Sequence, residues 1–101
     1  MYEEPVKISK TEFLILQIMI NHGADIYGLE IIRKSDNRIK QGTIYTTLSR
    51  MEDKGIITST KEEEIQEGLT AKRRMYTITG AGAKAMEQFQ RDIGMLQGVL
   101  V

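Results

Sequence analysis

The chain has 101 residues, which is enough for one domain of ordinary size and excludes a separate cofactor-binding domain beside it. A hydrophobic fraction of 41% and a charged fraction of 28% are typical of a globular protein and exclude a disordered one. Cysteine is absent, so disulfides and thiolate metal sites are excluded. The formal net charge is zero, which argues against a purely electrostatic nucleic-acid binder, because such domains are often strongly basic.

The sequence favours neither a membrane protein nor an enzyme. The longest apolar cluster, Phe13–Ile20, is interrupted by Gln17 and falls short of the ~20 residues that a membrane span requires. The N-terminus is mixed in charge and lacks the apolar core of a signal peptide, so we expect a cytoplasmic protein. His22 is the only histidine, so we expect no catalytic residues, no metal site and no cofactor.

Two helices are expected in the first part of the chain. Ser9 and Glu12 have the spacing of a capping box, which predicts a core helix over residues 9–22 that ends at Gly23. Residues 25–35 are predicted to form a second helix with Gly28 inside it. An internal glycine costs about 1 kcal/mol relative to alanine, which indicates the close approach of a neighbouring helix.

Residues 42–55 are predicted to form a third helix with two different faces. Ile44, Tyr45, Leu48 and Met51 recur at the spacing of a buried stripe. The opposite face is expected to carry hydroxyl and basic groups that suit a major groove, namely Thr43, Thr46, Thr47, Arg50 and Lys54. The polar segment 35–41 before it completes the local pattern of a helix-turn-helix, in which the second helix enters the groove. Basic residues outnumber acidic residues over positions 33–54.

A β-hairpin is expected to follow. Residues 56–60 and 72–78 have strand patterns, and the intervening residues 61–71 are too long for a tight turn, so we expect a mobile tip. A hairpin after a helix-turn-helix is a wing. Arg73 and Arg74 are expected on opposite faces of its second strand, so only one of them would point toward DNA. The acidic run Glu62–Glu64 argues against a tip that presses on a phosphate.

A last helix is predicted from about Gly80, capped by Thr79. Its apolar positions are spaced three, four, three and four residues apart, which is the seam of a heptad repeat, and they are Met86, Phe89, Ile93, Leu96 and Leu100. Such a narrow seam favours packing against a second copy of the chain, and we expect a homodimer. The alternative is that the helix folds back on the first helix of its own chain.

The order of these elements and the residues at their joints resemble the PadR family of winged-helix transcriptional regulators. The matching segments are Tyr27-Gly28, Gly42–Tyr45 with Leu48, Met51–Ile57, Arg73–Thr79 and Gly82. The resemblance implies a homodimer joined by the terminal helix, with the two third helices about one duplex turn (~34 Å) apart on a pseudo-palindromic operator. Thr47 stands where family members often have proline. Some relatives hold aromatic compounds between protomers, for which Phe89 or a tyrosine would provide stacking here.

We therefore expect an α+β, mainly α, winged helix-turn-helix with a β-hairpin wing over residues 1–79 and a C-terminal dimerisation helix over residues 80–101 of the same compact unit. The expected function is sequence-specific binding of double-stranded DNA as a transcriptional regulator and, by the resemblance, a repressor. The alternative is a winged helix used for protein–protein interaction. Candidate DNA contacts are Arg38, Lys40, Gln41, Gly42, Thr43, Tyr45, Thr46, Thr47, Arg50, Lys61, Lys72, Arg73 and Arg74, with Thr43, Thr47 and Arg50 foremost for the groove.

Overall fold

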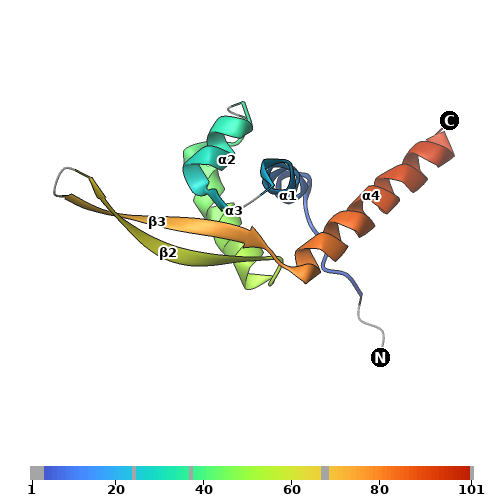
Figure 1. Cartoon of the computed structure of the whole chain (residues 1–101). Coiled ribbons are helices and arrows are strands. Elements are labelled where there is room, and N and C mark those ends of the chain that lie inside the picture. Colours follow the sequence, from blue (N-terminus) through green and yellow to red (C-terminus); the bar gives the residue numbers. More distant parts are fainter. Residues whose placement is uncertain (1–3, 24, 37, 67–68, 101) are drawn as a thin grey trace.

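The computed structural model describes residues 4–23, 25–36, 38–66 and 69–100, without the side chains of residues 63–66, 69–72 and 95–100. The described residues form four helices and a three-stranded antiparallel sheet, which confirms the expected winged-helix fold class (Figure 1). In chain order the elements are α1 (Lys10–His22), β1 (Ile26–Tyr27), α2 (Gly28–Lys34), α3 (Gln41–Asp53), β2 (Ile57–Gln66), β3 (Leu69–Ile78) and α4 (Gly80–Leu100).

Helix α1 begins and ends where the sequence predicts. The Ser9 amide donates to Glu12 Oε1 at 2.8 Å and the Glu12 amide donates to Ser9 Oγ at 3.1 Å, so the capping box is complete. Gly23 ends the helix at φ 81°, and its N–H donates to the carbonyls of Met19 and Ile20. Ile15 and Leu16 are fully buried, which makes α1 the central helix of the core.

The expected second helix is wrong at its start. Ile26 and Tyr27 form the short strand β1, which pairs with β3 at Tyr76 and Met75, and α2 begins only at Gly28. The sheet order is β1-β3-β2. Gly28 allows the close approach expected of it, because a Cβ at this position would lie 2.9 Å from the ring of Tyr45 in α3.

The wing is longer than the sequence indicates. The expected mobile tip is wrong over 61–66 and 69–71, because β2 continues to Gln66 and β3 begins at Leu69, while residues 67 and 68 lie outside the described residues. In the register, Glu62 lies opposite Arg73 and Glu63 lies opposite Lys72. Opposite charges at directly opposed positions favour pairing, so a polar segment without apolar alternation extends the hairpin.

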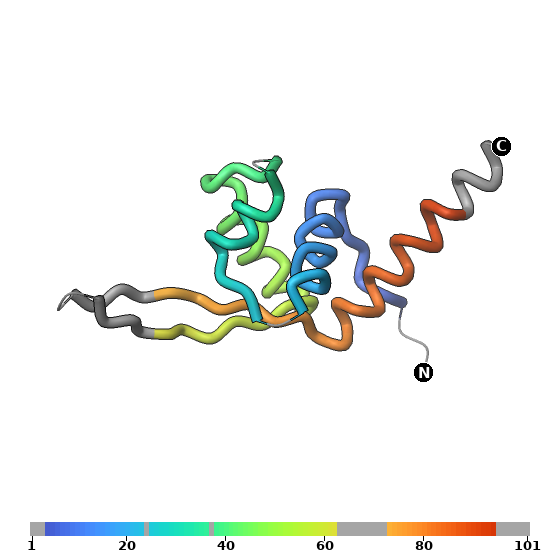
Figure 2. The backbone as a smooth tube through the Cα atoms, turned by 45° about the horizontal axis from the view of Figure 1, so that its top comes forward, coloured from blue at the N-terminus to red at the C-terminus, as the bar shows by residue number. Residues whose placement is uncertain are grey.

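Helix α4 leaves the domain on the side away from the wing (Figures 1 and 2). Its first turns pack inward: Ala85 and Met86 are buried, and the Phe89 ring stacks on the Phe13 ring at 4.6 Å and 23°. The seam is therefore not free along its whole length. Met86 lies in the core of its own chain and Phe89 contacts α1, so the fold-back alternative holds for this part of α4. The side chains of Leu96 and Leu100 lie outside those described.

Gly82 allows α4 to pass close to the backbone of Ile56, which directly precedes β2. A Cβ there would lie 2.1 Å from the carbonyl oxygen of Ile56. Thr79 caps the helix by accepting from the Gly82 amide at 3.1 Å and donating to the Gly55 carbonyl at 2.6 Å.

Among the described residues, no helix is long and apolar enough to cross a membrane.

Candidate nucleic-acid interface

The turn between α2 and α3 is fixed by one buried serine. Ser35 Oγ donates to the Ile32 carbonyl at 2.7 Å and accepts from the Ile39 amide at 3.3 Å. Ile39 is buried, and Asp36 adopts φ 54°, which aspartate tolerates better than most residues. These contacts set the direction in which α3 leaves the turn, and they form the helix-turn-helix that the sequence predicts.

The buried face of α3 differs from the prediction at two positions. Ile44, Thr47, Leu48 and Met51 are buried, while Tyr45 is 45% exposed. Thr47 was expected on the polar face, but it is only 8% exposed and its hydroxyl donates to the Thr43 carbonyl at 2.9 Å. The stripe therefore runs through Thr47, which is three residues from Ile44 and four from Met51, instead of Tyr45, which is three residues from Leu48.

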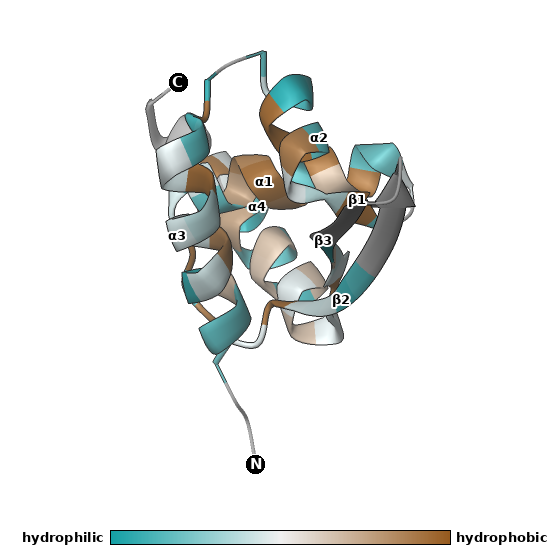
Figure 3. Ribbon diagram, turned by 90° about the vertical axis from the view of Figure 1, so that its left-hand side faces the viewer, coloured by the Kyte–Doolittle hydropathy of each residue, from teal (hydrophilic) through white to brown (hydrophobic). Residues whose placement is uncertain are grey.

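The outer face of α3 is polar and uncovered. In Figure 3 the ribbon of α3 is brown where it faces α1 and teal to pale on its outer side. Tyr45, Thr46, Ser49, Arg50 and Asp53 line a shallow hollow of about 500 Å³ on this face. The sequence prediction had missed Ser49 and Asp53, although their spacing from Thr46 and Arg50 would have revealed them.

The N-terminal end of α3 adds further exposed groups. Lys40 is its N-cap residue and has no side-chain capping bond. The other predicted contacts at this end are also exposed, namely Arg38, Gln41, Gly42 and Thr43. Among the predicted contacts from 38 to 50, Thr47 alone is buried, and the others are exposed.

One tyrosine of β1 contacts side chains of both wing strands. The Tyr27 hydroxyl donates to Glu62 Oε2 at 2.6 Å, and the Arg73 guanidinium lies 4.4 Å from the centre of the Tyr27 ring. Arg74 is exposed and donates to Ser59 Oγ at 3.1 Å. Lys61 is exposed, and the side chain of Lys72 lies outside those described.

A second hollow, of about 670 Å³, lies between α2, α3 and the wing, and we call it the wing-base hollow. It brings the predicted residues Tyr45, Lys61, Arg73 and Arg74 together. Both arginines line it, although alternation along the strand predicted that only one of them would point this way. The sequence prediction had missed the contribution of α2, because no local pattern indicates that this helix faces the wing. The residues that line the hollow are Tyr27, Gly28, Leu29, Glu30, Arg33, Tyr45, Lys61, Arg73 and Arg74.

Lys54 was expected on the outer face of α3, but it turns inward. Its Nζ donates to both carboxylate oxygens of Glu12, at 2.8 and 2.9 Å, and to the Lys7 carbonyl at 3.3 Å. Glu12 is only 3% exposed. Burial raises the pKa of the Glu12 carboxyl, but hydrogen bonds from Lys54 and Ser9 outweigh burial and hold that pKa below its ordinary value of 4.5. The ion pair joins the C-terminal end of α3 to the start of α1.

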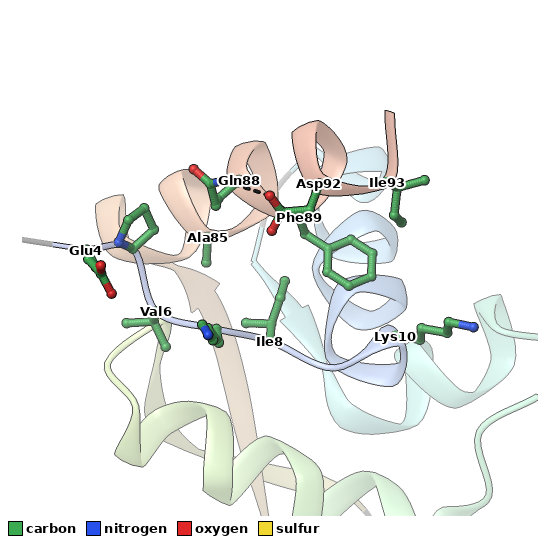
Figure 4. Close-up of a pocket in the computed structure, with 11 residues that line it drawn as sticks. Glu4, Val6, Ile8, Lys10, Ala85, Gln88, Phe89, Asp92 and Ile93 are labelled. Carbon is green, nitrogen blue, oxygen red and sulfur yellow. Dashed lines mark hydrogen bonds between the residues drawn. The ribbon is translucent and has the colours of Figure 1, made fainter. Parts of the chain in front are cut away.

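A groove of about 620 Å³ runs between residues 4–10 and α4 (Figure 4). Val6, Ile8, Ala85, Phe89 and Ile93 supply its apolar walls, and Ile8 and Phe89 point toward each other. Gln88 donates to Asp92 at 2.9 Å along the edge of α4. The groove therefore brings two of the predicted seam residues, Phe89 and Ile93, next to the N-terminal segment.

A helix-turn-helix followed by a β-hairpin defines a winged-helix protein. A family model described as the transcriptional regulator PadR-like family matches residues 15–88. The chain belongs to this family, whose members are transcription regulators and not enzymes.

Solved structures resemble the chain over most of its length. A PadR family transcription regulator from hypervirulent Clostridium difficile is 29% identical, with a TM-score of 0.74, and the match covers 91% of this chain and 95% of that one. A PadR-like transcriptional regulator from Bacillus cereus is 26% identical, with a TM-score of 0.63 and coverage of 89% and 86%. A winged-helix DNA-binding protein from STIV shares the fold at 18% identity, with a TM-score of 0.58 and coverage of 87% and 91%. No curated protein matches the chain.

Proposed function

We propose that the chain binds double-stranded DNA sequence-specifically and acts as a repressor, as a homodimer on a pseudo-palindromic operator. The observation that carries this proposal is the outer face of α3, where hydroxyl, phenol and guanidinium groups stand exposed opposite a fully buried stripe. A helix with this division of faces can lie in a major groove, where arginine reads guanine and threonine reaches base edges or the thymine methyl group.

Within this proposal the predicted contacts divide into two groups. Gln41, Thr43, Thr46 and Arg50 project from α3 and would meet base edges. Contacts to the sugar-phosphate backbone would fix the register of the helix, and they would come from Arg38, Lys40, Gly42, Tyr45, Lys61, Lys72, Arg73 and Arg74. Thr47 is left out of the interface because its side chain is buried and bonded to Thr43.

The homodimer would be made by residues 80–101, with residues 1–79 as the DNA-binding unit. Phe89 and Ile93 are half-buried beside the N-terminal segment, and α4 continues beyond the point where α1 covers it (Figure 2). An apolar seam that one helix of the same chain covers only in part gains most from a second copy. A two-fold dimer would present two α3 helices to two operator half-sites.

Replacement of Arg50 tests the DNA-reading role. An operator duplex is first selected from a random pool with the wild-type protein. Arg50→Ala should then weaken operator binding by about 1–3 kcal/mol in a gel-shift titration, because one good base contact is removed. Arg91→Ala is the matched control, since Arg91 is exposed on α4. Circular dichroism checks that both variants fold, and unchanged operator binding by Arg50→Ala would remove this residue from the interface.

A protein–protein interaction module is the second candidate, and the net charge of zero favours it. The two functions differ in their dependence on salt. A DNA binder loses affinity for duplexes steeply as salt rises, because bound phosphates release counterions. Wild-type protein that selects no duplex and shows no salt-dependent binding would support the interaction module instead.

A further inference from the structure

The wing-base hollow is more basic than the chain as a whole. Its walls contain four basic residues, Arg33, Lys61, Arg73 and Arg74, and one acidic residue, Glu30, although the whole chain has no net charge. Glu30 Oε1 accepts from the Tyr27 amide at 3.4 Å at the start of α2, and its negative charge offsets only one of the four positive charges. Cations gathered around a concave surface raise the local potential and favour an anion there.

Glu62, beside the hollow, offsets one further positive charge, which leaves the four basic residues in excess of the two glutamates. Glu62 lies opposite Arg73 in the β-ladder, and its carboxylate accepts the hydroxyl proton of Tyr27 at 2.6 Å. The ring of the same tyrosine lies under the guanidinium of Arg73 at 4.4 Å. Tyr27 thus holds both side chains at the base of the wing, and it acts as a positioning residue for Arg73.

The hollow also adjoins the helix that carries the proposed base contacts. Tyr45 lines both the wing-base hollow and the shallow hollow on the outer face of α3. A DNA strand whose base edges meet Arg50 and Thr46 would therefore pass Tyr45 on its way toward the wing. The phenol hydroxyl can donate to a phosphate oxygen, and guanidinium groups bind phosphate through paired N–H donors.

We propose that the wing-base hollow binds a phosphodiester of the DNA backbone, with Arg33 of α2 as a contact, Arg73 and Arg74 of the wing as its partners and Tyr27 as the positioning residue. This inference rests on the proposed DNA-binding function. The site joins α2, α3 and the wing around one phosphate.

The first test compares two neighbouring basic residues of α2. Arg33 lines the hollow, whereas Lys34 is exposed and does not line it. Each phosphate contact contributes a slope of about 0.9 to the dependence of log affinity on log salt. Between 50 and 200 mM salt, wild-type affinity should therefore fall about three- to fourfold more than that of Arg33→Ala. Lys34→Ala should keep the wild-type slope.

Arg33→Ala should also weaken operator and random duplexes by the same factor, because a phosphate carries no sequence information. Arg50→Ala, in contrast, should weaken the operator more than random DNA. An Arg33→Ala slope equal to that of wild type, or equal changes in Arg33→Ala and Lys34→Ala, would overturn the inference. If the wild-type protein binds no duplex at all, the proposed function itself fails.

Tyr27 is tested by two substitutions. Tyr27→Phe keeps the ring under Arg73 and loses the hydroxyl, while Tyr27→Leu loses both contacts. We expect Tyr27→Leu to reduce the salt slope and Tyr27→Phe to restore most of it, with both variants folded by thermal denaturation. Equal slopes for Tyr27→Leu and wild type would remove the positioning role.

A last experiment distinguishes binding of the duplex backbone from binding of a free phosphate anion. Inorganic phosphate is added to the protein–duplex complex, and sodium chloride of equal ionic strength is the reference. Free phosphate competes for the same guanidinium groups, so for a backbone site it should displace the duplex more than chloride does in wild type and no more than chloride does in Arg33→Ala. Phosphate that binds the wild-type protein at saturating duplex without displacing it would indicate a site for free phosphate and overturn the assignment to DNA.

Discussion

Replacement of Lys54 by methionine should destabilise the protein in a way that depends on pH. The lysine donates to both oxygens of Glu12, which is 3% exposed, and its own side chain is 31% exposed. Hydrogen bonds to charged groups contribute about 1.5–3 kcal/mol, and breaking a fully buried pair costs about 3–5 kcal/mol. Water can reach the lysine end of this pair, so we expect a loss of about 1.5–3 kcal/mol at pH 7.

The pH dependence follows from the pKa of Glu12. In the wild type this pKa lies below 4.5, so the contribution of Glu12 to stability is present above 4.5 and is lost as pH falls through the folded pKa. Without Lys54, only the hydrogen bonds from Ser9 oppose the effect of burial, so the pKa of Glu12 should rise from its wild-type value. The ionised carboxylate then contributes less to stability at neutral pH, so Lys54→Met has less stability to lose than the wild type as pH falls.

The assay is urea unfolding of the wild type and Lys54→Met at pH 7 and at about pH 4, with Lys84→Met as control because Lys84 is exposed on α4. The difference in unfolding free energy between the wild type and Lys54→Met should shrink at the lower pH. For a domain of this size each kcal/mol corresponds to about 4–8 °C in Tm, so thermal scans give a second readout. An equal loss at both pH values, or a loss no larger than that of Lys84→Met, would refute this reasoning.

Two further predictions concern α4. Gly82→Ala should cost about 1–3 kcal/mol in thermal unfolding because its methyl group would meet the Ile56 carbonyl, whereas Gly80→Ala, with no atom within 4 Å of the added Cβ, should be neutral or stabilising. Equal stability of the two variants would contradict the close approach. Ile93→Asp should give monomers in sedimentation equilibrium because it places a charge in the proposed seam, while Arg91→Asp should remain dimeric. A dimeric Ile93→Asp would place the contact elsewhere.

Local chemistry alone was enough to predict the ends of several elements. Ser9 with Glu12, Gly23, Gly55 and Thr79 act through hydrogen bonds and backbone angles within a few residues of themselves, so they mark the ends of α1, α3 and β3 without any knowledge of the fold. The apolar periodicity of α1 and α3 was sufficient in the same way. In this order, those elements predicted a helix-turn-helix with a wing.

Tertiary contacts decided three features that the local sequence pattern could not predict. Ile26 and Tyr27 are a strand only because β3 lies beside them to accept the pairing. Tyr45 and Thr47 flank the same stripe of α3, and the tertiary structure buries Thr47 and leaves Tyr45 45% exposed. The wing extends to Gln66 because cross-strand pairing, which no single-strand pattern records, stabilises a charged segment.

The candidate interface likewise has features that the sequence alone predicts and features that only the tertiary structure shows. The sequence by itself determined that α3 has a polar face, because helical period alone separates Thr43, Thr46 and Arg50 from Ile44, Leu48 and Met51. Only the tertiary structure decided that Lys54 turns inward to Glu12, that Met86 lies in the core, and that Arg33 stands beside the wing. Each of these depends on a partner distant in sequence, and a side chain's nearest neighbours in space are not encoded in its nearest neighbours along the chain.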